Sequence, residues 1–182
     1  MTMSNSIQLA MNPPRFLEKD GIRIAPRRRE PSSPFMWPLR AVGGVVPHVL
    51  AAHDNDRLGV DLGYTLAPSG GLVPVYAAND GEVACAIESP TGCAISLDHS
   101  GTWSTHYTGL TMAVVTRCLP KLKRRQYVRA GQVIGYATQP RIGFELWKWT
   151  DDRGYVAVDP RPYVATWTNA PASNIAVAKK AA

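Results

Sequence analysis

The sequence has no hydrophobic run long enough to cross a bilayer. Its longest apolar stretch, residues 41–52, is interrupted by Gly43, Gly44, Pro47 and His48, and it is shorter than the roughly 18 residues that a spanning helix needs. The N-terminus has no positively charged segment followed by an apolar one, so no signal peptide is predicted. We therefore expect a soluble protein with no membrane partner.

Cysteine is scarce. The three cysteines, Cys85, Cys93 and Cys118, are not in a CxxC or any other metal-ligand spacing. The 15 glycines and 15 prolines among 182 residues are too few for a collagen-like or low-complexity chain. Cys85 and Cys93 fall on segments expected to be adjacent strands, so a disulfide is one interpretation. The favoured interpretation is that the thiols are free and buried.

Basic side chains outnumber acidic ones. Lys and Arg total 20 against 14 Asp and Glu, which gives a net charge of +6 and permits anionic partners such as nucleic acid, teichoic acid or an acidic protein surface. Tyr127 is the only aromatic residue in segment 117–129, which disfavours binding to single-stranded nucleic acid. This segment is expected to be a solvated loop or docking surface. Its basic patch consists of Arg117, Lys121, Lys123, Arg124, Arg125 and Arg129.

Proline is concentrated at the start of the chain. Seven of the 15 prolines lie within residues 1–47, and few large apolar residues accompany them. We expect residues 1–33 to be an extended Pro/Arg-rich arm that is ordered by contacts with other chains. The predicted domain covers residues 34–164, and residues 165–182 are predicted to be a C-terminal tail.

Short alternating segments separated by turn residues dominate the predicted domain. Val83, Cys85 and Ile87 share one face of such a segment. Trp147 and Trp149 also share a face, which is either core or interface, and we expect one of them in the core. Strands this short, with turns every 8–12 residues, predict an antiparallel sheet folded on itself. The candidate strands are 72–76, 82–87, 93–97, 103–107, 132–136 and 143–147.

The order of segments across residues 34–164 resembles the lysostaphin-like, or M23, family of zinc peptidoglycan endopeptidases. The resemblance implies a mostly β fold, an antiparallel sandwich of the duplicated hybrid motif type, here with the extended N-terminal arm. It rests on segments 34–39, 57–63, 75–83, 95–99, 104–107, 128–136, 144–146 and 158–164.

The resemblance also implies a site, and this sequence departs from it. In the family, zinc is held by His-x-x-x-Asp and by the second His of His-x-His, while two further His assist the attacking water. Four of these five positions are replaced here, so no catalytic residue, no metal and no cofactor are expected, because a lone carboxylate cannot hold a catalytic zinc. The vestigial groove consists of Arg57, Asp61, Gly109, Arg141 and Gly143.

Two interpretations of this groove stay open. It is either a repurposed site for an anionic or peptidic ligand, or a salt bridge has filled the space of the metal, and the salt bridge is favoured. At least one of Arg57 and Arg141 is expected to donate a charge-assisted hydrogen bond to Asp61. Strand alternation relative to Tyr107 predicts that His106 points away from the groove.

The absence of an export signal and the arm favour a non-catalytic structural component of a bacteriophage tail or baseplate, by analogy with the reuse of wall-hydrolase folds in such particles. It would assemble in the host cytoplasm, reside in the virion and contact other virion proteins through the arm. Peptidoglycan or another anionic polymer is a further candidate partner. The alternative is an inactive M23-like regulatory or binding module acting on cell-wall hydrolases or peptidoglycan, and an active metallo-endopeptidase is the least favoured hypothesis.

Overall fold

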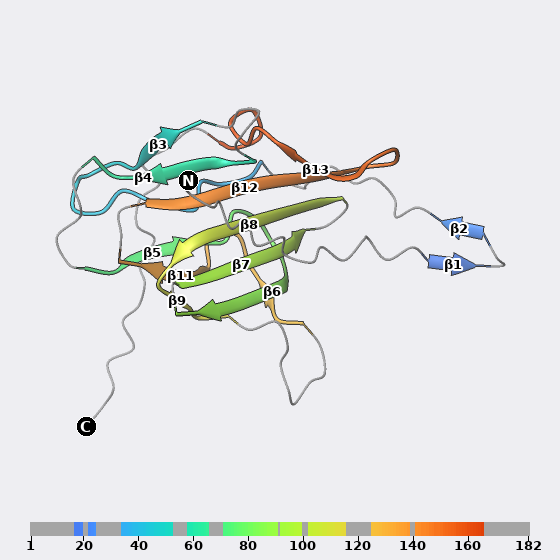
Figure 1. Ribbon diagram of the computed structural model, residues 1–182, viewed down its shortest axis with the longest axis horizontal. Helices are drawn as coiled ribbons and strands as arrows, with labels where there is room; N and C mark the ends of the chain where they lie inside the picture. The colour runs from blue at the N-terminus through green and yellow to red at the C-terminus, as the bar shows by residue number, and fades with distance from the viewer. Residues whose placement is uncertain are drawn as a thin grey trace, which may run out of the picture.

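The computed structural model describes residues 17–19, 22–24, 34–52, 58–65, 71–90, 92–99, 102–115, 125–138 and 141–165 (Figure 1). These residues form strands and turns, and none of them belongs to a helix that could span a membrane. The strands are β1 (Leu17–Lys19), β2 (Ile22–Ile24), β3 (His48–Ala51), β4 (Val60–Gly63), β5 (Val73–Tyr76), β6 (Gly81–Ser89), β7 (Gly92–His99), β8 (Trp103–Leu110), β9 (Met112–Ala113), β10 (Tyr127–Val128), β11 (Val133–Ala137), β12 (Arg141–Thr150) and β13 (Gly154–Val158).

Two antiparallel sheets build the domain. The larger has the order β10-β6-β7-β8-β12-β4-β3, and β13 pairs with the second half of β12. The smaller has the order β5-β11-β9, and its strands contact β7 and β8 (Figure 1). The predicted antiparallel β sandwich is therefore confirmed.

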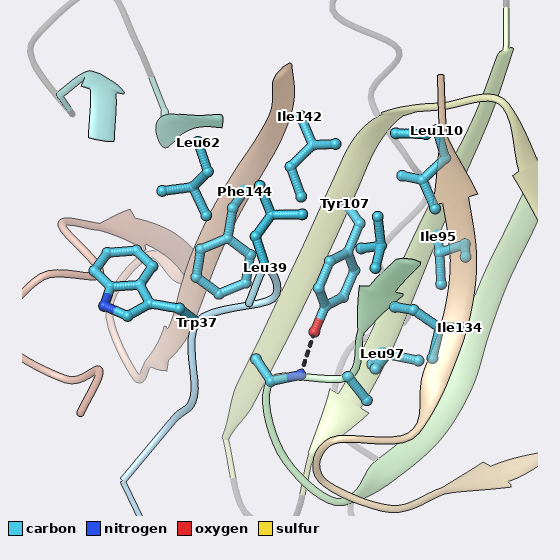
Figure 2. Packing of buried hydrophobic residues seen from close by; sticks show 14 of the residues in the cluster. Trp37, Leu39, Leu62, Ile95, Leu97, Tyr107, Leu110, Ile134, Ile142 and Phe144 are labelled. Carbon is cyan, nitrogen blue, oxygen red and sulfur yellow. Dashed lines mark hydrogen bonds between the residues drawn. The ribbon is translucent and has the colours of Figure 1, made fainter. Parts of the chain in front are cut away.

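Alternation along β12 shows why the sequence forms this sheet. Ile142, Phe144 and Leu146 are buried in the core, while Gly143 and Glu145 between them lie on the opposite face. Figure 2 shows the resulting packing between the sheets. The core cluster includes Phe35, Trp37, Leu39, Val60, Leu62, Ile95, Leu97, Trp103, Tyr107, Leu110, Ile134, Ile142, Phe144 and Leu146.

The start and the end of the described sandwich lie side by side. Phe35 is fully buried and forms a parallel bridge with Val164. Its amide donates to the Tyr163 carbonyl at 3.1 Å, and the Ala165 amide donates to the Phe35 carbonyl at 2.8 Å. Phe35, together with Trp37 and Leu39 from the same segment, is thus part of the core. Upstream, β1 and β2 pair in a small hairpin within the segment expected to be extended, and the other residues of 1–33 lie outside the described part.

A chain of buried polar groups runs through the core. The Asp80 carbonyl accepts from Nδ1 of His99 at 2.7 Å, and Nε2 of His99 lies 2.7 Å from the Thr105 hydroxyl. That hydroxyl lies 2.9 Å from the Tyr107 hydroxyl, which accepts from the Ala78 amide at 2.8 Å (Figure 2). Burial lowers the pKa of His99 to about 4, so the imidazole is neutral in this chain.

The favoured interpretation of the cysteines is confirmed for two of them: Cys85 pairs with Ser96 and Cys93 with Glu88, so the two thiols are out of register and form no disulfide. Cys118 lies outside the described residues. The expectation of one core tryptophan was wrong, because Trp147 and Trp149 both lie on the β12 face opposite Phe144 and are half-buried there.

Candidate functional site

The floor of the candidate groove is the outer face of β4, β8 and β12. Gly143 on β12 is directly opposite Asp61 on β4 and Thr108 on β8, so these three positions share the face. The Arg141 guanidinium makes an ion pair with the Asp61 carboxylate. The expected hydrogen bond to Asp61 is therefore confirmed for Arg141, while Arg57 lies outside the described residues.

Exposure differs between the two partners of this ion pair. The Asp61 side chain is 16% exposed, whereas that of Arg141 is 55% exposed. The carboxylate is thus largely covered and its charge is balanced by the guanidinium, as a covered charge requires. The outer side of the Arg141 guanidinium still faces solvent and can donate further hydrogen bonds.

Thr108 and the two glycines set the shape of the floor. A Cβ at Gly143 would overlap Oγ1 of Thr108, so the threonine occupies the space that a side chain at 143 would need. Gly109 has a φ of 76°, a value that favours glycine. It lies in a bulge, since Ile95 pairs with Tyr107 and Cys93 pairs with Leu110.

His106 lies on the groove face, contrary to the expectation from strand alternation. Tyr107 points into the core, so ordinary strand alternation places its two neighbours, His106 and Thr108, together on the outer face. The expectation was wrong because it took the side of Tyr107 as the groove side. His106 is directly opposite Glu145, with 3.4 Å between Nδ1 and Oε2. The Trp147 indole N–H donates to the same Oε2 at 2.8 Å, and the Trp147 and His106 rings pack with their centroids 5.5 Å apart.

The Glu145 carboxyl is held in its ionised form. Burial by itself would raise its pKa, but hydrogen bonds from His106 and Trp147 outweigh burial and lower it. Sequence reasoning missed this His106, Glu145 and Trp147 cluster. The i, i+2 spacing of Glu145 and Trp147 was a usable signal, but the partnership with His106 depends on the register of β8 against β12.

The basic patch is only partly described. Arg125 is not freely solvated, because it makes an ion pair with Asp98 at 2.6 Å and its side chain is 23% exposed. Burial raises the pKa of Asp98, although Arg125 opposes that rise. Arg129 is exposed, and its backbone amide donates to the Gln132 side chain at 3.1 Å. The other members, Arg117, Lys121, Lys123 and Arg124, lie outside the described residues.

These residues do not fit a catalytic zinc. Asp61 is the one family ligand that remains, and its carboxylate is engaged by the Arg141 cation. Thr108 fills the space beside Gly143, where the second His of His-x-His would place its ring. Within the described part of the chain, no three His, Cys, Asp or Glu side chains are close enough together to hold a metal ion. A zinc site needs about three protein ligands.

The two sheets and the polar floor across β4, β8 and β12 define a peptidase-like β sandwich. The family model "Peptidase family M23" matches residues 58–160, more than half of the chain, and the chain therefore belongs to that family. No curated protein sequence matches it.

Three solved structures show the same fold. Two are chains of the SpoIIQ-SpoIIIAH complex, one described as a pore forming complex, with TM-scores of 0.50 and 0.52 and identities of 21% and 20%. They align with 69% and 71% of this chain and with 91% and 99% of their own lengths. Csd3 of Helicobacter pylori has a TM-score of 0.52 and 17% identity over 74% of this chain, which spans 34% of Csd3.

Proposed function

We propose that this chain is a non-catalytic M23 domain that acts as a binding module for peptidoglycan or for a protein that acts on peptidoglycan. The observation that carries the proposal is the ion pair between Arg141 and Asp61 on the groove floor. It occupies the position from which an M23 enzyme would use a metal ion.

An arginine there cannot replace the metal chemically. The guanidinium is always protonated, so it cannot coordinate water or lower the pKa of a bound water as a zinc ion does. It can bind, however, because its exposed N–H groups are matched to carboxylate and carbonyl oxygens. The groove thus retains hydrogen-bonding groups that suit a ligand and lacks the groups that would cleave one.

The structural neighbours support a binding role for the fold. Chains of this fold occur in the SpoIIQ-SpoIIIAH complex, in which two proteins assemble with each other. At about 20% identity this likeness concerns the fold, so the partner of the present chain is a proposal.

Two measurements on the purified full chain test the proposal. We expect the protein to co-sediment with purified peptidoglycan or with a cell-wall hydrolase, to carry no stoichiometric zinc and to leave the turbidity of wall preparations unchanged. About one zinc per chain that is lost in Asp61→Ala, together with a fall in turbidity, would contradict it. Binding to neither partner would also contradict it.

The bacteriophage tail or baseplate hypothesis rested on fold analogy and on the arm. No feature of the described residues and none of the comparisons supports it, so virion partners and virion localisation stay predictions. The measurement that tests them is the detection of this chain in purified particles.

A further inference from the structure

A single buried polar atom on the groove face lacks a partner. Among the side chains that the structure describes, Nε2 of His106 is the one buried nitrogen or oxygen with no hydrogen bond. His106 as a whole is 4% exposed. Since buried polar atoms are nearly always satisfied, an unsatisfied one points to a missing hydrogen-bonding group.

The neighbours of His106 determine which ring nitrogen carries the proton when the imidazole is neutral. The Glu145 carboxylate is ionised and can only accept hydrogen bonds, so Nδ1 of His106 has to carry the proton that points to it. The Trp147 indole donates to the same carboxylate oxygen and holds it in place. In the neutral ring, Nε2 is consequently an acceptor, and the missing group is a donor.

At the other end of the groove floor, Arg141 is a hydrogen-bond donor that complements the acceptor Nε2 of His106. Arg141 presents an exposed guanidinium that donates, and the exposed residue Thr108 lies between it and His106. Residues 141 and 145 are four apart on β12, about 13 Å along an extended chain. A donor and an acceptor at this separation match the carbonyl and amide groups of an extended peptide about four residues long.

We propose that His106 is a ligand-contacting residue, whose Nε2 accepts a hydrogen bond from a backbone amide N–H of an extended peptide on the groove floor. Arg141 donates to a carbonyl oxygen of the same peptide. Glu145 and Trp147 are positioning residues that fix the tautomer and orientation of the imidazole. This inference rests on the proposed function, because it requires that the groove binds a ligand.

Binding involves a small rearrangement. Nε2 of His106 is buried, so the side chains that cover it have to shift when a donor arrives. Trp147 packs on the imidazole and reports such a shift through its fluorescence.

The first experiment needs no ligand. Nitrogen-15 NMR of the full chain distinguishes the two neutral tautomers of His106. We expect the proton on Nδ1, and the ring should switch to the other tautomer or to a mixture in Glu145→Gln. A proton on Nε2 of the neutral ring in the unsubstituted chain would overturn the arrangement, and it would leave the proposed binding function standing.

The second experiment uses a synthetic peptidoglycan stem peptide and a series in which each amide in turn is N-methylated. N-methylation at one position should weaken binding to the unsubstituted chain about five- to tenfold, which is the loss of affinity expected for one hydrogen bond. In His106→Phe the same N-methylation should have no further effect. His48→Phe is the matched control, because His48 lies on β3, separated from His106 by β12 and β4.

The outcomes separate the two proposals. Equal losses on N-methylation in the unsubstituted chain and in His106→Phe would overturn the role of His106 while leaving peptide binding intact. Failure of the unsubstituted chain to bind any stem peptide would overturn this inference. If the chain still co-sedimented with a cell-wall hydrolase, the proposed function would remain supported. If His106→Phe does not fold, the tautomer measurement on the unsubstituted chain still tests whether Nε2 of His106 is an acceptor.

Discussion

Arg141 reaches across the pairing of β12 with β4 and holds the carboxylate of Asp61. This contact joins position 141, where the resemblance implies a histidine, to the position of an implied zinc ligand. It balances the charge of a largely covered aspartate.

Thr108 should control whether the groove can be given a zinc site. Arg57→His with Gly143→His supplies, together with Asp61, the three protein ligands that a zinc site needs, but Thr108 overlaps the Cβ position of residue 143. We expect little zinc in that double variant and about one zinc per chain after Thr108→Ala is added, measured by metal analysis and calorimetric titration. Thr108→Ala by itself is the control and should bind none. Full zinc binding by the double variant would show that Thr108 does not exclude the ligand.

Stability should fall in mild acid because of His99. Its pKa is about 4 in the folded chain against 6.5 in the unfolded one, so between these values the unfolded state binds more protons. The free energy of unfolding should therefore drop as pH falls from about 6.5 towards 4, by on the order of 3 kcal/mol. Urea denaturation across this range measures it.

His99→Gln provides the control for that pH dependence. The substitution should lower stability at neutral pH, because the links to Asp80 and Thr105 are weakened, and should remove most of the slope between pH 6.5 and 4. A slope unchanged in His99→Gln would assign the pH dependence to other groups.

Trp147→Phe should raise the pKa of Glu145. The substitution keeps a ring beside His106 and removes the indole N–H that donates to the carboxylate at 2.8 Å. With one stabilising hydrogen bond lost, the carboxyl pKa moves upward towards or beyond its ordinary value. Carbon-13 NMR titration of the Glu145 carboxyl measures the shift, and Trp149→Phe is the control. A lower pKa in Trp147→Phe would contradict the assignment.

Tyr107→Phe should destabilise the fold. The Tyr107 hydroxyl is buried and accepts from the Ala78 amide, so its removal leaves that amide without a partner. We expect a loss of about 1–3 kcal/mol in the free energy of unfolding, measured by denaturant titration. Tyr136→Phe, at a half-buried tyrosine on β11, should change stability much less. Equal effects of the two substitutions would show that the Tyr107 hydroxyl is not needed.

The family and the fold could be predicted from local patterns. Alternation in segments such as 142–146 predicts a strand with one buried face, because side chains along a strand alternate strictly between faces. The expectation that the groove holds no metal used only residue identity at Arg57, Gly109, Arg141 and Gly143, and it stays a prediction.

Strand register was decided only in the tertiary structure. The pairing of β8 with β12 shows that the face of His106 is the groove side, and the offset between Cys85 and Cys93 prevents a disulfide, although neither follows from spacing along the chain. The overlap of Thr108 with position 143 depends on two strands meeting in one alignment. The sequence alone determined which faces are apolar. Only the pairing of distant strands decided which polar side chains meet, because a shift by one residue moves a side chain to the other face.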